Sequence, residues 1–189
     1  MLPESIWESA LELQTFLQQH KLSFVFIGGL AVQRWGQPRM TDDIDLTVVI
    51  PFGTESQLAR TMLNRYQSRH PKPIEFALEA RILLLRDLSG IEIDLSIGGM
   101  PFEHRMLERS SEWGVPGGGQ IRTCGAEDLV VLKGFADRSQ DWIDVENIVC
   151  RQGNKLDRKL MLEELGYLAE LKEQPELLHR LQSIFDKSN

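Results

Sequence analysis

The sequence predicts an α/β (α+β) protein, with a mixed sheet flanked by helices and a small helical C-terminal part. Over about the first 120 residues, short β-prone runs alternate with amphipathic helical segments. After the Gly/Pro-dense stretch 112–119, the apolar pattern becomes almost entirely helical. A length of 189 residues suits one domain, or one domain with an appendage. We therefore expect a core at 1–124 and a helical subdomain at 125–189.

The elements of the core follow from local periodicity. Apolar residues recur at helical spacing over 6–17, which predicts an amphipathic helix. The β-prone run 24–27 stops at Gly28-Gly29, and 30–35 is typical of a short helix. Residues 43–50 alternate at first and then become continuously apolar, as expected for a partly buried strand.

The rest of the chain continues this pattern. A helix is predicted at 57–66, and strands at 81–86 and 91–97 flank a hairpin turn. In the second of these strands the isoleucine and leucine side chains face one way, and Glu92, Asp94 and Ser96 face the other. A last strand is predicted at 120–123, and helices follow at 126–137, 141–151, 156–171 and 175–186.

Composition limits the function classes. Lys and Arg number 21 against 28 Asp and Glu, so the net charge is -7, which argues against an extended basic surface for nucleic acid or membrane. The two cysteines do not form a disulfide framework, and the four scattered histidines disfavour a structural zinc site. No secretory signal is visible, and the longest apolar run, 24–32, is too short to cross a membrane. We therefore expect a cytoplasmic protein with no membrane partner.

The most informative pattern is Gly28-Gly29, thirteen further residues, and then Asp43-Ile44-Asp45-Leu46. Residues i and i+2 of a strand project to the same face, so Asp43 and Asp45 lie side by side and repel each other. A bound Mg²⁺ would compensate for this repulsion, because it prefers carboxylate oxygens. A Gly-Gly turn before a helix lets a phosphate approach the backbone.

A purely structural interpretation competes with this one. Acid pairs are common at strand starts and Gly-Gly often ends a strand, so each feature alone has roughly one chance in ten of being catalytic. Asp94 adds a third carboxylate on the polar face of its strand. Three acids on two strands beside a glycine turn are typical of two-metal phosphoryl or nucleotidyl transfer.

These residues resemble a known signature. Gly28-Gly29, Asp43-Ile44-Asp45-Leu46 and Ile93-Asp94-Leu95 are similar to the motif of the polymerase-β-type nucleotidyltransferase superfamily. The stretch 29–46 resembles the small bacterial branch, which includes abortive-infection type IV toxin nucleotidyltransferases and antibiotic-modifying enzymes. The segment from Glu127 to Lys133, followed by Arg138, Asp141 and Asp144, looks like the downstream Lys…Arg…Asp block of the toxin-like group.

The resemblance, which covers most of 20–148, implies a nucleotidyltransferase sheet, an NTP donor and two Mg²⁺ ions. Asp43, Asp45 and Asp94 would be the catalytic, metal-holding residues, and Asp94 would also assist deprotonation of the acceptor hydroxyl. Gly28 and Gly29 would bind the triphosphate through backbone N–H groups.

Two basic residues have alternative interpretations. Arg39 can reach a phosphate of the nucleotide, or it can be a surface arginine that balances Asp42. The resemblance implies that Lys133 contacts the donor triphosphate; alternatively, Lys133 can pair with Asp137 at i+4. Arg138, Asp141 and Asp144 are expected to orient one another or to cap a helix rather than to react.

The leading hypothesis is an Mg²⁺-dependent enzyme that moves an NMP from an NTP onto a hydroxyl of RNA, protein or a small molecule. Its role would be toxin-like, with a cognate antitoxin, or resistance-like. The alternative is a catalytically silent nucleotidyltransferase-fold module that binds a partner, as an antitoxin does. Three retained aspartates favour the enzyme, while the acidic composition disfavours a large nucleic acid as acceptor.

Overall fold

The computed structural model describes residues 2–188, which group into two compact units. The first contains the chain up to Leu30 together with Arg39–Cys124, and the second contains Ala31–Pro38 together with the chain from Gly125 onward. A division at residue 124 assigns 31–38 to the core, whereas in the structure this segment packs with the second unit.

Side chains near residue 150 explain this grouping. Gln152 Nε2 donates to the carbonyl oxygen of Trp35 at 2.7 Å, and Arg151 Nη1 donates to that of Gly36. A Cβ atom on Gly36 would lie 3.0 Å from Ile148, so the segment fits closely against helix α7 (Ser139–Gln152).

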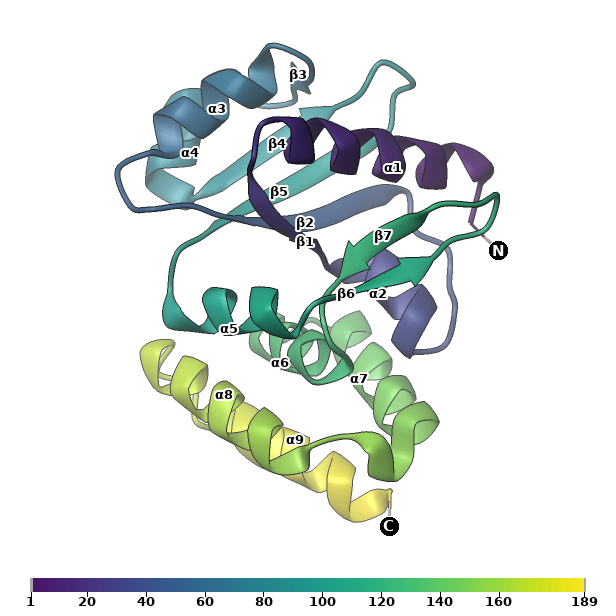
Figure 1. Cartoon of the computed structure of the whole chain (residues 1–189). Helices are drawn as coiled ribbons and strands as arrows, with labels where there is room; N and C mark the ends of the chain where they lie inside the picture. Colours follow the sequence, from purple (N-terminus) through teal and green to yellow (C-terminus); the bar gives the residue numbers. More distant parts are fainter. Residues whose placement is uncertain (1, 189) are drawn as a thin grey trace. The chain divides into compact units, whose positions relative to one another are not determined.

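Within residues 2–188, seven strands form one mixed sheet in the order β3-β4-β5-β2-β1-β7-β6 (Figure 1). The β2–β5 and β1–β7 pairs are parallel, and the other neighbouring pairs are antiparallel. The predicted fold class, a mixed sheet with flanking helices, is therefore confirmed. The strands are β1 (Ser23–Phe26), β2 (Asp43–Val49), β3 (Gln67–Ser68), β4 (Ile82–Arg86), β5 (Glu92–Gly98), β6 (Ser111–Gly114) and β7 (Gln120–Thr123).

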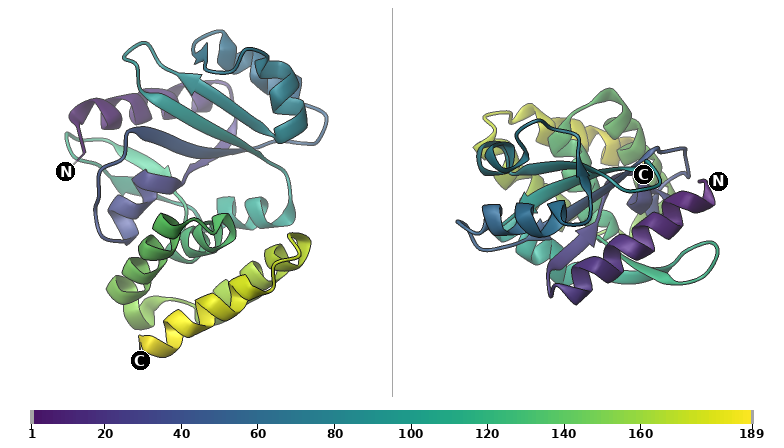
Figure 2. Two further views of the ribbon diagram at one scale, coloured as in Figure 1. Left: turned by 180° about the vertical axis from the view of Figure 1, so that it is seen from behind. Right: turned by 90° about the horizontal axis from the view of Figure 1, so that it is seen from above.

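Helices cover both faces of this sheet. Figures 1 and 2 show α1 (Glu4–Gln19), α3 (Glu55–Leu63) and α4 (Pro73–Ala80) on one side and α5 (Pro101–Arg109) on the other. The core lies on the α1 side, where alternate residues of the two central strands are buried: Ile44, Leu46 and Val48 of β2, and Ile93, Leu95 and Ile97 of β5. Because strand side chains alternate, the aspartates of β2 and β5 project from the opposite face.

The second unit is helical, as the apolar periodicity indicates. The buried stripe of its last helix, Leu177, Leu181 and Ile184, repeats at the expected spacing. Among the described residues, no helix is long and apolar enough to span a membrane. The helices are α2 (Gly28–Trp35), which begins in the first unit, α6 (Ala126–Ala136), α7 (Ser139–Gln152), a 3₁₀ turn (Gly153–Lys155), α8 (Arg158–Leu171) and α9 (Glu176–Lys187).

Three differences from the predicted elements have local causes. Residues 112–114 are not loop, because β6 pairs with β7 in a hairpin whose turn contains three glycines with positive φ. Helix α5 was not predicted, although Pro101 begins it and the Glu103 carboxylate accepts the Met100 N–H at 2.8 Å. Helix α4 likewise starts at a proline, Pro73.

Candidate functional site

Strands β2 and β5 bring three aspartates together. Asp45 is the register partner of Asp94, and Asp43 is the partner of Glu92. Asp43, Asp45 and Asp94, called the acid cluster below, each offer one carboxylate oxygen, and these oxygens lie within 4.8 Å of one another. The structure therefore places the aspartates in one group, whereas their catalytic role stays a prediction.

The Gly-Gly turn lies directly against this cluster. Gly28 begins α2 with φ at +54°, and a Cβ atom there would fall 1.9 Å from Asp45 Oδ2. A Cβ atom on Gly29 would fall 2.5 Å from Thr41 Oγ1. Both glycines are therefore required by close approach, which brings the N-terminus of α2 against the carboxylate of Asp45.

Two residues that the sequence did not single out hold the aspartates. Thr41 Oγ1 donates a hydrogen bond of 2.6 Å to Asp43 Oδ1. The guanidinium of Arg69 forms an ion pair with Asp94. Thr41 is two residues before Asp43, so its contact could have been predicted from proximity in the sequence. Arg69 comes 25 residues before Asp94, and no local sequence pattern predicts their contact.

The acid cluster has the chemistry of a divalent-cation site. Its ligands are carboxylate oxygens, which Mg²⁺ and Mn²⁺ prefer, and its three side chains are half-buried rather than enclosed. Asp42, the neighbouring acid in sequence, is exposed and lies outside the cluster. The donor set therefore fits a metal ion that retains open coordination positions.

Arg39 belongs to the same unit as the acid cluster. Its side chain is partly buried, and Nη1 donates to the carbonyl oxygen of Met40 at 3.1 Å. The predicted contact of Arg39 with phosphate stays a prediction.

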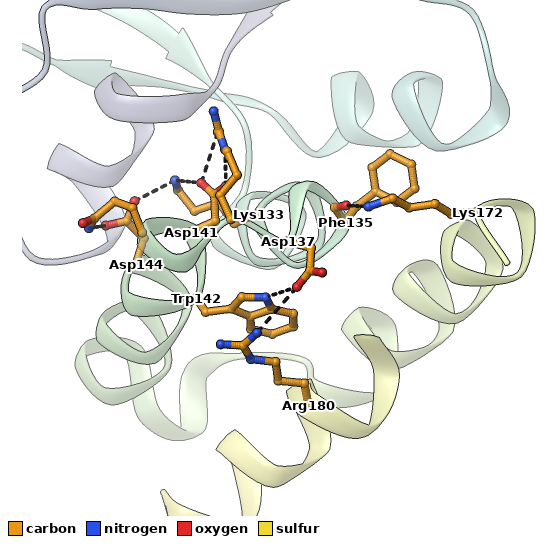
Figure 3. Close-up of polar contacts among 10 residues, drawn as sticks. Lys133, Phe135, Asp137, Asp141, Trp142, Asp144, Lys172 and Arg180 are labelled. Carbon is orange, nitrogen blue, oxygen red and sulfur yellow. Dashed lines mark hydrogen bonds and ion pairs between the residues drawn. The ribbon is translucent and has the colours of Figure 1, made fainter. Parts of the chain in front are cut away.

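Lys133 lies in a buried ion-pair group of the second unit. Its Nζ is 3.0 Å from Asp141 Oδ1 and 2.7 Å from Asp144 Oδ2 (Figure 3). The side chains of Lys133, Asp141 and Asp144 are only 6%, 3% and 1% exposed. Lys133, Asp141 and Asp144 together form this buried ion-pair group. This arrangement shows the structural partners of Lys133; its predicted contact with the donor triphosphate stays a prediction.

The alternative prediction, an i+4 ion pair between Lys133 and Asp137, is wrong, because Lys133 pairs with Asp141 and Asp144 instead. Asp137 ends α6 in the left-handed conformation, with φ at +59°, and its Oδ1 accepts a 2.6 Å hydrogen bond from Trp142 Nε1. Arg180 lies 3.6 Å from the same oxygen and stacks on the Trp142 ring (Figure 3). The carboxylate therefore ties α6, α7 and α9 together.

Arg138 and Asp141 orient each other, as expected from the sequence. Arg138 Nε donates to Asp141 Oδ2 at 2.6 Å. Burial raises the pKa of the Asp141 carboxyl, but hydrogen bonds from Arg138 and Lys133 outweigh it and hold that pKa below its usual value. Asp141 is therefore kept as an anion inside the second unit.

Comparison with one solved structure shows a nucleotidyltransferase-like fold, and two further structures are similar at lower TM-scores. The antigenic nucleotidyltransferase-like protein from Paracoccidioides brasiliensis matches with a TM-score of 0.54 at 15% identity, over 93% of this chain and 91% of that one. The antibiotic-resistance factor ANT(2'')-Ia gives 0.49 at 15% identity, over 98% and 94%. The lincosamide antibiotic adenylyltransferase LnuA gives 0.47 at 16% identity, over 78% and 96%.

Sequence comparison identifies the family. No curated protein matches the chain significantly. The family described as "Nucleotidyl transferase AbiEii toxin, Type IV TA system" matches residues 13–182, which is most of the chain. The predicted resemblance to the type IV toxin branch is thereby confirmed, and the chain belongs to the AbiEii family of nucleotidyl transferases.

Proposed function

We propose that the protein transfers a nucleoside monophosphate from an NTP to a hydroxyl group of its acceptor, at a metal site formed by the acid cluster. The observation that carries this proposal is the convergence of three carboxylate oxygens within 4.8 Å beside the Gly28 turn. Three crowded carboxylates repel one another, so a fold that needed only structure would gain nothing from them.

Each residue has a distinct task in this proposal. Asp43, Asp45 and Asp94 would hold the divalent cations, and Asp94 would also accept the proton of the attacking hydroxyl. Two Mg²⁺ ions, when bound, would neutralise charge on the triphosphate and on the leaving pyrophosphate. Backbone N–H groups of Gly28 and Gly29 orient the triphosphate, and Arg39 contacts a phosphate oxygen. Attack at the α-phosphorus forms the new ester bond and expels pyrophosphate, so atoms and charge balance.

Labelled-donor transfer tests this proposal. The protein is incubated with each α-labelled NTP, Mg²⁺ and a cell extract, and the labelled product shows both the donor and the acceptor. We expect label on one class of molecule, lost in EDTA and in Asp45→Asn. Asp42→Asn is the matched control, because it removes a neighbouring exposed carboxylate outside the acid cluster and should leave transfer unchanged.

Other outcomes decide against the proposal. Transfer that Asp45→Asn retains would remove the acid cluster from the mechanism. If the wild type transfers no label and is not stabilised thermally by Mg²⁺ with any NTP, the silent partner-binding module replaces the enzyme.

We also propose a toxin-like role in the cytoplasm, where NTP is available, countered by a cognate antitoxin. The family description, which includes a type IV toxin–antitoxin system, supports this role. Induced expression should arrest growth for the wild type and for Asp42→Asn, but not for Asp45→Asn at equal protein level. Arrest by Asp45→Asn would separate toxicity from nucleotidyl transfer.

A further inference from the structure

Arg69 reaches the acid cluster from the far side of a neighbouring strand. It directly follows β3, and its backbone N–H donates to the carbonyl oxygen of Leu84 in β4 at 2.9 Å. Leu84 is the register partner of Asp94 in β5. The Arg69 side chain therefore crosses β4, and its Nη1 binds Asp94 Oδ1.

A second acid holds Arg69 in place. Glu92 precedes Asp94 by two residues and projects from the same face of β5. Arg69 Nη2 lies 2.7 Å from Glu92 Oε2, so the two terminal nitrogens of one guanidinium bind carboxylates two residues apart. Glu92 Oε1 is bound in turn by Arg86 Nη2 at 2.6 Å. The result is a continuous row of charges, Arg86, Glu92, Arg69 and Asp94.

Within this row, Arg69 is the member that binds Asp94, the carboxylate that the metal site needs. The ion pair engages Oδ1 of Asp94, one of its two oxygens, and the planar guanidinium restricts the rotation of the carboxylate. The Arg69 side chain is 21% exposed, so its position is fixed largely by packing and by Glu92. Its positive charge also offsets part of the repulsion among the three aspartates before any cation binds.

We propose that Arg69 is a positioning residue that holds Asp94 in the orientation in which the acid cluster binds a divalent cation. This inference rests on the proposed metal site. Partners that orient metal-binding carboxylates typically contribute ten- to a hundredfold to metal affinity. Arg69 acts through its two-pronged geometry, because its charge alone would oppose the binding of a cation.

Mn²⁺ binding to the 189-residue protein without nucleotide, followed by electron paramagnetic resonance, tests this inference. Arg69→Lys keeps the charge but replaces the fork with a single point donor, and should raise the Mn²⁺ dissociation constant roughly tenfold or more. Arg86→Lys is the matched control: the same exchange on the same Glu92, at a residue that does not bind Asp94. It should change the dissociation constant by less than about twofold, given the small contribution of exposed pairs.

The possible outcomes are distinct. Wild-type affinity in Arg69→Lys, or tighter binding in Arg69→Gln, would overturn the inference, since Arg69 would then be neutral or a competing cation. If the wild type binds Mn²⁺ and Asp45→Asn does not, such a result leaves the proposed metal site standing. If the wild type itself binds no Mn²⁺, the metal site and the inference both fail.

Folding is measured for each variant by thermal unfolding in EDTA. If Arg69→Lys does not fold, Glu92→Gln removes the second anchor of Arg69 without touching Asp94. It should raise the dissociation constant by about threefold, a smaller effect than loss of the direct partner. Unchanged Mn²⁺ affinity in Glu92→Gln would then overturn the inference.

Discussion

The acid cluster of the first unit and the buried ion-pair group of the second gather aspartates in opposite surroundings. In the ion-pair group the side chains of Asp141 and Asp144 are 3% and 1% exposed, and both bind the ammonium of Lys133. In the acid cluster the Asp94 side chain is 37% exposed and converges with two further carboxylates rather than with a buried lysine. The charges of Asp141 and Asp144 are balanced inside the fold by Lys133, while the aspartates of the acid cluster remain accessible to a ligand.

Because of this difference, we expect substitutions in the two groups to affect different properties of the protein. Removing the Lys133 ammonium from the ion-pair group leaves two buried carboxylates without it, so the free energy of unfolding falls. Removing the charge of Asp45 from the acid cluster relieves the repulsion among the carboxylates, so stability is kept while metal binding and transfer are lost. Activity and unfolding measured on the same variants therefore test whether the two groups differ in this way.

The largest expected effect is on transfer by Asp45→Asn. Loss of one metal-binding carboxylate should cost about 4 kcal/mol of transition-state stabilisation, which is roughly a thousandfold in rate. The melting temperature in EDTA should not fall, because the substitution removes one of three crowded charges. Steady-state transfer and thermal unfolding check the two halves. A variant that loses activity only because it unfolds would contradict the comparison.

The next effect is on stability, in Lys133→Met. Two buried carboxylates would lose their shared ammonium, and removing one partner of a buried ion pair costs about 3 kcal/mol or more. Denaturant unfolding measures the change. Lys159→Met is the matched control, because Lys159 is exposed and lies 3.6 Å from the exposed Glu163, a pair worth less than about 1 kcal/mol. Equal losses in the two variants would show that the ion-pair group has no special structural weight.

A smaller effect is expected from Gly28→Ala compared with Gly53→Ala. Both glycines have positive φ, at +54° and +87°, so alanine strains either position by about 1–2 kcal/mol. Only at Gly28 would the new Cβ meet a neighbour, 1.9 Å from Asp45 Oδ2, whereas Gly53 faces open space. We expect Gly28→Ala to lose more stability, by about 1 kcal/mol, and also Mn²⁺ affinity. Equal losses of stability and of Mn²⁺ affinity in the two variants would show that the close approach of Gly28 to Asp45 does not matter for the site.

Much of the fold follows from the sequence because its core strands are strongly patterned. In β5 the alternation of isoleucine and leucine with Glu92, Asp94 and Ser96 fixes which residues face the core. The two-residue strand β3 is too short to show an alternation of apolar and polar residues. Strand β6 could not be recognised from the sequence because the glycine-rich turn of its hairpin follows it directly. Helix α5 has the start signals Pro101 and Glu103, which periodicity alone does not detect.

The site divides in the same way. Asp43 and Asp45 share a face because strands alternate, and Asp94 joins them through the parallel register of β2 and β5. Local sequence rules do not supply contacts that depend on tertiary packing. Arg69 meets Asp94 only because β4 lies between β3 and β5, and Lys133 takes partners eight and eleven residues away because α7 packs on α6.

The smallest expected effect is a pH dependence of the second unit. Since the pKa of Asp141 is lower in the folded protein than in the unfolded chain, its charge stabilises the fold fully above the unfolded value of about 3.9. That contribution is lost as the pH falls through the lowered pKa of the folded state. We therefore expect Asp141→Asn to melt below the wild type at about pH 5, with the gap narrowing towards about pH 3.

Melting curves of the two proteins over this range measure the gap directly. Glu55 and Asp87 also have lowered pKa values, but they are present in both proteins, so the difference isolates Asp141. Adding Arg138→Gln to the wild type should move the acid loss to higher pH, because the Arg138 hydrogen bond helps to hold the pKa down. A gap that stays constant or widens in acid would show that Asp141 does not draw its stability from the charges of Lys133 and Arg138, and the contrast with the acid cluster would then rest on burial alone.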